Sequence, residues 1–175
     1  MTIADLKENE YGEYYKKYIS LVTSQDLTDA MEYGTSQTIK LMNNIPPSKY
    51  DYSYAEGKWT IKETMLHIMD TERIFCYRAL RFARGDSTEL PGFDQDDYIP
   101  MAKGHQRSFS AILKEYKSVR QASIALYKSF DEEMLGRIGI ASGNPFSVRA
   151  LGYIITGHEI HHRNILKERY LDDEV

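Results

Sequence analysis

Four long stretches of this 175-residue chain contain almost no glycine or proline, and they restrict the possible folds more than any other feature. Within these stretches apolar residues recur every three or four positions, which is the spacing of an amphipathic helix. The turn-forming residues that separate them lie at Pro46-Pro47, Gly57, Gly85, Pro91-Gly92, Pro100, Gly104, Gly136, Gly139 and Gly143-Asn144-Pro145. The sequence therefore predicts four helices, near residues 25–45, 60–85, 108–130 and 147–170.

Capping signals mark the boundaries of two of these helices. Thr60-Ile61-Lys62-Glu63 matches a capping box, in which a threonine hydroxyl and a glutamate carboxylate satisfy backbone donors reciprocally. Gly85 suits the residue after a helix end, which often adopts a left-handed conformation. Ser147 can accept a hydrogen bond as the N-cap of the last helix. These signals predict a second helix that ends at Gly85 and a last helix from Ser147 to about Tyr170.

Four long helices without a convincing alternating strand pattern predict an all-α fold, a four-helix bundle. The connections 46–59, 86–107 and 131–146 are longer than ordinary bundle loops, and loops of this length often form lids or site walls. We expect a single domain over residues 1–175, with a bundle core of about 25–170. We also expect a tyrosine-rich N-terminal segment to pack on the bundle as a short helix; its tyrosines are Tyr11, Tyr14, Tyr15 and Tyr18.

The charge distribution argues against a nucleic-acid partner. The net charge is −4, whereas binding to phosphates requires clustered lysines and arginines. The densest basic cluster, Arg78, Arg81 and Arg84, is followed by acidic residues, and we interpret it as solvated surface. No apolar run approaches the ~20 residues that span a bilayer, and the N-terminal segment lacks the apolar region of a signal peptide. We therefore expect a cytoplasmic protein without a membrane partner.

The single cysteine, Cys76, fits a reducing compartment and cannot form an intrachain disulfide. Any metal would then be held by histidines and carboxylates. The most informative pattern for such a site lies in the last helix, where His158 and His162 fall inside the apolar stripe at about 100° per residue. Two imidazoles at this spacing can share one divalent cation, or they can be hydrogen-bonded core histidines, and the pattern leaves both open. His161 lies at the flank of the stripe.

A third ligand would have to come from His67 or His105. His67 lies within the second predicted helix, and a rigid element holds ligand geometry better than the loop that carries His105. However, periodicity alone predicts that His67 is a surface residue, because it lies away from the strongest apolar face of its helix. It shares its side with Thr64 and Thr71, a mixed face that could line a wet cavity or meet solvent.

Two glutamates are candidates for a supporting role at such a site. Glu72 falls in an apolar face, where an unpaired carboxylate is costly, and Arg120 on the third helix is a candidate partner. The pair could be structural, or it could support the site or act in acid–base chemistry. Glu159 belongs to the string His158-Glu159-Ile160-His161-His162, which satisfies the zinc-peptidase pattern HExxH. That pattern is short, and neither a ligand-bearing continuation nor a neighbouring sheet accompanies it, so a peptidase is a minor alternative.

Three segments together resemble the DinB-like family of bacterial proteins, which includes the YfiT-like metal-dependent hydrolases and thiol transferases. They are KWTIKETMLHIMDTERIFCYR, LPGFDQDDY and SVRALGYIITGHEIHHRNILKERY, and the resemblance extends over about residues 10–172. It implies a four-helix bundle with a long crossover connection. It also implies one divalent metal ion, zinc or nickel, held by His67, His158 and His162, and it outweighs the periodicity argument about His67. Relatives are often homodimers.

The activities that the resemblance implies are varied. They include metal-dependent hydrolysis, and transfer or isomerisation that uses low-molecular-weight thiols such as bacillithiol or mycothiol. We favour a thiol S-transferase that acts on a small molecule, with a thiol as cosubstrate. The alternatives are a hydrolase and a non-catalytic, metal-stabilised stress-response protein. A cavity that reaches the metal would favour an enzyme, whereas a closed coordination sphere would favour the structural role.

Some further residues could wall such a cavity. Trp59 is one, and acids of the 86–107 connection are others, although we interpret these acids as a solvated loop; they are Asp94, Asp96 and Asp97. Cys76 is not expected to be a nucleophile, because it lies on the apolar side of its helix, away from His67.

Overall fold

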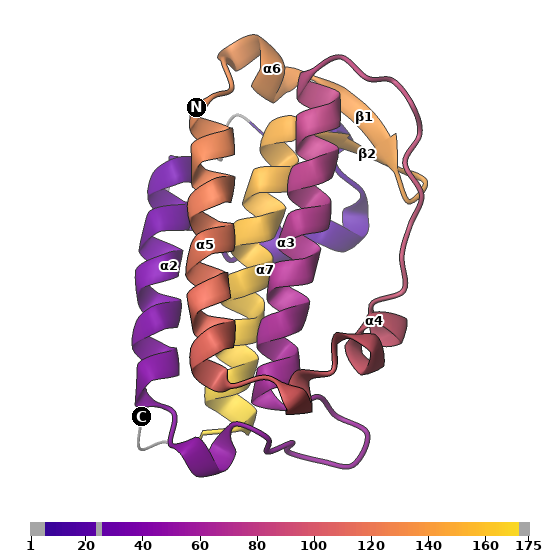
Figure 1. Ribbon diagram of the computed structural model, residues 1–175. Helices are drawn as coiled ribbons and strands as arrows, with labels where there is room; N and C mark the ends of the chain where they lie inside the picture. The colour runs from indigo at the N-terminus through magenta and orange to yellow at the C-terminus, as the bar shows by residue number, and fades with distance from the viewer. Residues whose placement is uncertain (1–5, 24–25, 172–175) are drawn as a thin grey trace.

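The computed structural model describes residues 6–23 and 26–171, so the outermost residues of the predicted domain and residues 24–25 lie outside the description. Its main body is four long helices, α2 (Leu27–Asn44), α3 (Ile61–Ala83), α5 (Phe109–Lys128) and α7 (Val148–Arg169). Helices α3 and α2 each pack against both α5 and α7 (Figure 1). The prediction of an all-α four-helix bundle is confirmed.

The connection from α3 to α5 is the long crossover that the resemblance implied. It leaves α3 at one end of the bundle, runs down the outside and enters α5 at the other end (Figure 1). Along the way it forms α4 (Gln95–Ala102) and the short 3-10 helix η5 (Gly104–Gln106). Helix α4 packs against α3 and therefore covers one side of the bundle.

The predicted caps form as expected. The Thr60 side chain accepts a hydrogen bond from the Glu63 backbone, and the Glu63 carboxylate accepts one from the Thr60 backbone. Ser147 caps α7 by accepting from the backbone of Ala150 at 3.0 Å. Gly85 has a φ of 78°, the left-handed conformation that ends a helix. These contacts satisfy backbone groups that a helix end leaves unpaired.

The 131–146 connection differs from the prediction, because it contains a small sheet. After α6 (Glu132–Gly136), strands β1 (Ile138–Ala141) and β2 (Asn144–Ser147) pair in antiparallel register. Each strand has only four residues, so alternation is too short to stand out in the sequence. The crossover joins this hairpin, since the backbone of Leu90 bonds to Ile140 at 2.9 Å and to Ser142 at 3.0 Å.

The described part of the N-terminal segment lies along α7. It forms η2 (Glu8–Glu10), η3 (Glu13–Tyr15) and α1 (Lys16–Ile19), and α1 packs against α7. Gly157 allows this close approach, because a Cβ there would lie 2.0 Å from the carbonyl oxygen of Tyr18. The short η4 (Pro47–Lys49) follows α2 at the other end of the bundle.

The buried interior consists of two apolar clusters with polar groups between them along the helices. One cluster includes Phe82 and Ile154, and the other includes Met65 and Leu166. At intermediate positions on the helices are buried polar side chains, among them Thr38, His67, Glu72, Arg120 and Glu159. The chemistry of the molecule is therefore concentrated around the middle of the bundle.

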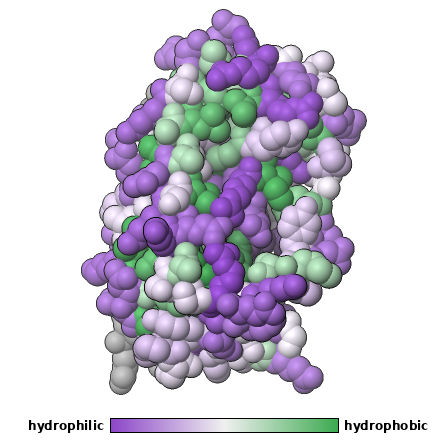
Figure 2. All heavy atoms as spheres, in the orientation of Figure 1, coloured by the Kyte–Doolittle hydropathy of each residue, from purple (hydrophilic) through white to green (hydrophobic). Residues whose placement is uncertain are grey.

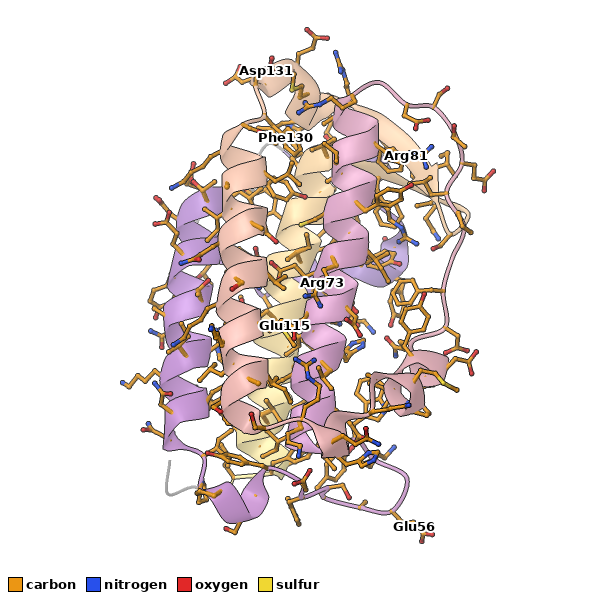
Figure 3. All side chains as sticks on the ribbon, viewed as in Figure 1. Glu56, Arg73, Arg81, Glu115, Phe130 and Asp131 are labelled. Atoms are coloured by element: carbon orange, nitrogen blue, oxygen red, sulfur yellow. The ribbon has the colours of Figure 1, made fainter. Side chains whose placement is uncertain are left out.

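The outer surface is mostly hydrophilic in the view of Figure 2, with hydrophobic residues gathered near the upper ends of α3 and α5. Lower on this face, Arg73 of α3 and Glu115 of α5 point toward each other, 2.6 Å apart (Figure 3). No helix among the described residues combines the length and apolarity that crossing a bilayer requires.

Candidate metal centre

Three buried histidines converge between α3 and α7. His67 comes from α3, and His158 and His162 come from successive turns of α7. The Nε2 atom of His158 lies 3.0 Å from that of His67 and 3.1 Å from that of His162. Their exposed fractions are only 3%, 6% and 8%, in chain order. The structure thus brings together the three histidines that the resemblance implied.

Hydrogen bonding among the imidazoles does not fully explain this arrangement. Each Nε2 atom carries either one proton or one lone pair, so the Nε2 of His158 can serve its two neighbours only by sharing. A shared cation would engage all three lone pairs. Two nitrogens bound to one zinc at ~2.0–2.1 Å are roughly 3.0–3.4 Å apart. The two observed distances fit this spacing, so the donor set fits a metal ion.

Burial keeps these imidazoles uncharged. It lowers the pKa of His67 to about 4, with a smaller contribution from the charge of His161. Burial also lowers the pKa of His162 to about 2 and that of His158 well below its ordinary value. Neutral imidazole is the form that binds a metal, so the ligands are in the required state at neutral pH.

The other candidate histidines lie elsewhere. His105 is exposed in η5 and does not join the cluster. His161 is half-buried beside the three clustered histidines, and its ring centroid lies 5.3 Å from that of Tyr18. Within the described residues, His67, His158 and His162 are the one group of three side chains placed to hold a metal ion.

The periodicity argument about His67 is wrong because the crossover and the α2–α3 connection cover that side of α3. The ring of Trp59, from the second of these segments, lies 4.6 Å from that of His67. On the mixed face that His67 shares, Thr71 and Thr64 each line a cavity, as one of the two interpretations held, whereas His67 itself lines neither. A helix period locates side chains on one cylinder but says nothing of a loop that later packs against it.

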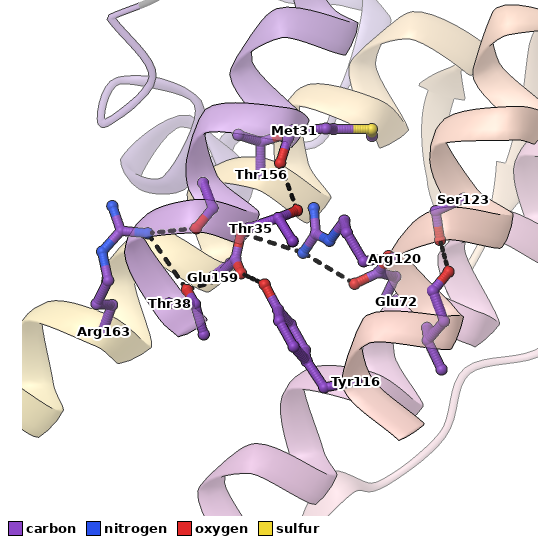
Figure 4. Close-up of polar contacts among 12 residues, drawn as sticks. Met31, Thr35, Thr38, Glu72, Tyr116, Arg120, Ser123, Thr156, Glu159 and Arg163 are labelled. Carbon is purple, nitrogen blue, oxygen red and sulfur yellow. Dashed lines mark hydrogen bonds and ion pairs between the residues drawn. The ribbon is translucent and has the colours of Figure 1, made fainter. Parts of the chain in front are cut away.

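Glu159 points the other way from its neighbour His158. Its carboxylate is fully buried between α2, α5 and α7, where it accepts hydrogen bonds from Tyr116 and, at 2.8 Å, from Thr38 (Figure 4). Arg120 lies 3.1 Å from its other oxygen. A glutamate held in this way cannot activate water at the histidines, so the HExxH match does not describe a peptidase site.

The predicted pairing of Glu72 with Arg120 is present. Arg120 Nη2 lies 2.9 Å from Glu72 Oε2, and both side chains are almost fully buried. These are ion-pair distances without the angles of linear hydrogen bonds. Burial raises the pKa of Glu72, although Arg120 opposes this. For Arg120, burial alone would lower the pKa, but the negative charges of Glu159 and Glu72 outweigh burial, so the net change is a raised pKa. Neither glutamate contacts the histidines through any bond found in the described residues.

Two open cavities, each of about 590 Å³, reach the histidine cluster, one at His158 and the other at His162, while His67 lines neither. The tyrosine cavity, named for its three tyrosines, includes Tyr14, Tyr15, Tyr18, Thr71, Phe75 and His158 in its lining. The tryptophan cavity includes Tyr54, Trp59, Thr64, Ile165, Tyr170 and His162. Gln95 and Asp96 of α4 line both. The crossover therefore forms a wall shared by two spaces that reach different histidines of the same cluster.

Sequence reasoning found some of these walls and missed others. Trp59 lines a cavity, as considered, and so do Asp94 and Asp96 at the start of α4. These two acids are nevertheless exposed, as is Asp97, which lines neither cavity. Gln95 was missed, because nothing in a single sequence marks an uncharged residue of a loop as part of a wall.

Known proteins resemble the chain in both sequence and fold. The sequence profile of the DinB superfamily matches residues 30–166. One relative is OB0413 of Oceanobacillus iheyensis, whose name gives it as a metal-dependent hydrolase by inference. It is 24% identical to this chain over 146 residues. That alignment covers 81% of this chain and 83% of the relative.

Two solved structures show the same fold. YfiT of Bacillus subtilis, described as a probable metal-dependent hydrolase with an unusual four-helix bundle topology, superposes with a TM-score of 0.62 at 18% identity. The match covers 94% of this chain and 92% of YfiT. A mycothiol-dependent maleylpyruvate isomerase superposes with a TM-score of 0.65 at 14% identity, over 93% of this chain and 62% of the isomerase.

Proposed function

Because the chain belongs to the DinB superfamily, we propose that it is a metal-dependent enzyme that acts on a small molecule. In this proposal His67, His158 and His162 hold one divalent ion, zinc or nickel. The observation that carries it is the convergence of three neutral imidazoles, two of which each line an open cavity. Three protein ligands leave coordination positions free, as in catalytic rather than structural zinc sites.

The ion would supply positive charge that stabilises a thiolate or a hydroxide near neutral pH. The chain's own residues do the rest. The imidazoles stay unprotonated because they are buried, and Trp59 covers the His67 ring on the side of the tryptophan cavity. On the other side Tyr18 stands edge-on to His158, with 5.3 Å between ring centroids. Aromatic side chains thus limit water around the ligands while both cavities stay open to substrates.

We favour transfer to or from a low-molecular-weight thiol over hydrolysis. Hydrolysis needs one organic substrate and water, whereas thiol transfer needs two organic molecules, and two cavities of equal volume reach the cluster at His158 and at His162. Glu159, the one candidate base from the HExxH pattern, faces the core instead. A structurally similar isomerase is named for its dependence on the thiol mycothiol, which is consistent with this preference.

The thiol would have to come from outside the protein. Cys76 is the only cysteine in the sequence, and burial raises the pKa of its thiol to about 12. It lies 3.3 Å from the Ser123 hydroxyl, between α3 and α5 rather than beside the histidines. A thiol with so high a pKa is almost entirely protonated at neutral pH and is a poor nucleophile.

The test is a conjugation assay with zinc-loaded protein, a bimane electrophile and either bacillithiol or mycothiol. Turnover should require the metal and the thiol, disappear in His67→Ala, and persist in Cys76→Ser. Equal loss in both variants would indicate a protein thiol instead. Metal-dependent cleavage of esters or amides without added thiol would establish the hydrolase alternative. Metal binding without either activity, across a panel of thiols and esters, would favour the non-catalytic stress-response role.

The cytoplasmic location, the homodimer, the single domain and the lack of a nucleic-acid partner belong to the same proposal. Gel filtration and a DNA-binding assay would test the second and the last of these.

A further inference from the structure

Arg78 is a buried cation without an ionic partner among the described residues. It is 2% exposed, so the interpretation of Arg78, Arg81 and Arg84 as solvated surface is wrong for this member. Its Nη2 donates to the carbonyl oxygen of Pro91 at 3.0 Å and to Ser142 Oγ at 2.9 Å. Its Nη1 is buried without a hydrogen-bond partner. By contrast, the other deeply buried arginine, Arg120, lies against two carboxylates.

The guanidinium lies directly behind the wall of the tyrosine cavity, although Arg78 itself does not line it. Its neighbours Phe75, Phe93 and Ser142 all line that cavity, and its carbon is 5.3 Å and 5.8 Å from the centroids of the two phenylalanine rings. Ser142 uses a lone pair to accept from Arg78, so its hydroxyl proton remains available to a ligand.

A second unpartnered polar atom lies between Arg78 and the histidines. Thr71 lines the tyrosine cavity, and its hydroxyl is buried without a hydrogen-bond partner. Elsewhere in α3, Thr64 donates to the carbonyl oxygen four residues earlier, which is the usual solution for a helical threonine. Because Thr71 does not do this, its hydroxyl is available to whatever occupies the cavity.

These groups share one face of α3. His67, Thr71 and Arg78 are separated by four and seven residues, so at about 100° per residue they point in nearly the same direction. Eleven residues correspond to roughly 16 Å along the helix axis from His67 to Arg78. The tyrosine cavity therefore extends along α3, from His158 past Thr71 to the residues that surround an unpaired cation.

We propose that the tyrosine cavity binds an elongated small molecule that carries a carboxylate, which Arg78 and Ser142 receive while the other end of the molecule lies at the histidines. The inference deepens the proposed function and depends on it only for the reacting end. One carboxylate oxygen would accept a charge-assisted hydrogen bond from Nη1, and the other would accept the hydroxyl proton of Ser142, since both protons of Nη2 are already donated. Asp94, the N-cap of α4, and Asp96 in its first turn are both exposed, so water screens their repulsion of an anion.

Burial supports the same assignment. It lowers the pKa of Arg78, which means that the folded protein holds this charge at a cost in free energy. An anion bound beside it would offset that cost. A purely structural role, in which Arg78 ties the crossover to the hairpin turn, explains the bonds of Nη2 but leaves Nη1 without a role.

The test uses the full chain in metal-free form and two probes of similar shape, 4-phenylbutyrate and 4-phenyl-1-butanol, in isothermal titration calorimetry. The wild-type protein should prefer the carboxylate. Arg78→Met should weaken phenylbutyrate binding by about tenfold or more, because a charge-assisted hydrogen bond is lost, and should change phenylbutanol binding by less than about twofold. Arg81→Met is the matched control, since Arg81 is one turn further along α3 and is paired with Asp86.

Ser142→Ala keeps the proposal testable if Arg78→Met does not fold, because Ser142 is exposed in the hairpin turn. It should weaken phenylbutyrate binding by about threefold and leave phenylbutanol binding unchanged. Equal weakening of both probes in either variant, no preference for the carboxylate in the wild type, or an equal effect of Arg81→Met would overturn the proposal. Failure of the metal site would not affect this result, since every one of these measurements uses the metal-free protein.

Discussion

His158 and Glu159 are consecutive residues of α7 that face two different buried polar clusters. On the His158 side, three uncharged imidazoles crowd together beside two open cavities, and their lone pairs have no sufficient partner in the protein. On the Glu159 side, a carboxylate meets Arg120, Tyr116 and Thr38 in the closed centre of the bundle. One cluster is accessible and gathers three like groups with no cation among them, whereas in the other the chain itself places a cation against two carboxylates.

The difference separates a binding site from a structural network. Buried polar groups in native proteins are nearly always partnered, so a convergent group that lacks partners indicates a ligand that the chain alone does not supply. A buried ion pair, in contrast, fixes how helices meet, and breaking one side of it is costly. We therefore expect changes on the His158 side to alter metal binding and changes on the Glu159 side to alter stability.

The largest expected effect is the loss of metal from His158→Ala. The purified wild-type protein should bind about one zinc or nickel ion per chain, and His158→Ala or His162→Ala should reduce this to near zero, because two imidazoles hold a metal poorly. Glu159→Gln is the matched control on the next residue, and it should still bind about one ion. Elemental analysis of dialysed protein measures this. Full occupancy in both histidine variants would mean that the site lies elsewhere.

The second effect concerns stability. Arg120→Met leaves Glu72 and Glu159 buried without their cation, and such a change typically costs about 3–5 kcal/mol of the free energy of unfolding. Arg73→Met, which removes the partly exposed pair with Glu115, should cost less than about 1 kcal/mol. Urea unfolding of the metal-free variants measures both. If Arg120→Met kept wild-type stability yet lost the metal, the closed cluster would support the site rather than the fold.

The fold could be predicted well from the sequence because its signals are local. The helix period and the caps at Thr60, Gly85 and Ser147 each depend on residues within a few positions of one another. The short hairpin was missed because its pairing involves two strands of four residues, joined by a turn in which Ser142 adopts a φ of 51°. Gly143 did mark a turn in the sequence, but strands of four residues on either side of it are too short for alternation to show.

The site was only half predictable from the residues themselves. His158 and His162 are four residues apart on one helix, so their convergence follows from helix geometry. His67 joins them only through the packing of α3 against α7, and the family resemblance rather than the period identified it. Arg78 was assigned to the surface because helical spacing cannot show that Pro91 and the hairpin turn fold over it.

A third effect is a pH dependence of the free energy of unfolding, which in the metal-free protein we expect from His67 in the histidine cluster. His67 has a pKa of about 4 in the folded chain against an ordinary 6.5, so as the pH falls the unfolded chain takes up this proton first. Stability should therefore decline from about pH 6.5 downward, by on the order of 3 kcal/mol at pH 4 from this residue. Urea unfolding at pH 7, 5.5 and 4 should show a smaller decline for His67→Gln. An identical pH dependence in the two proteins would mean that His67 is not buried in its neutral form.

The smallest effect tests how tightly the Glu159 side is closed. Gly34 of α2 lies against Glu159, and a Cβ at this position would be 2.8 Å from Glu159 Oε2. Alanine usually stabilises a helix by about 1 kcal/mol relative to glycine, but here the carboxylate cannot retreat without loosening its contacts with Thr38 and Arg120. We expect Gly34→Ala to destabilise the protein by about 1–2 kcal/mol while metal binding stays unchanged.

Gly136→Ala is the control, because nothing lies within 4 Å of a Cβ there, and it should be neutral or slightly stabilising. A stabilised Gly34→Ala protein would mean that the closed cluster has room to rearrange, and the contrast between the two sides of α7 would then be one of charge rather than of packing.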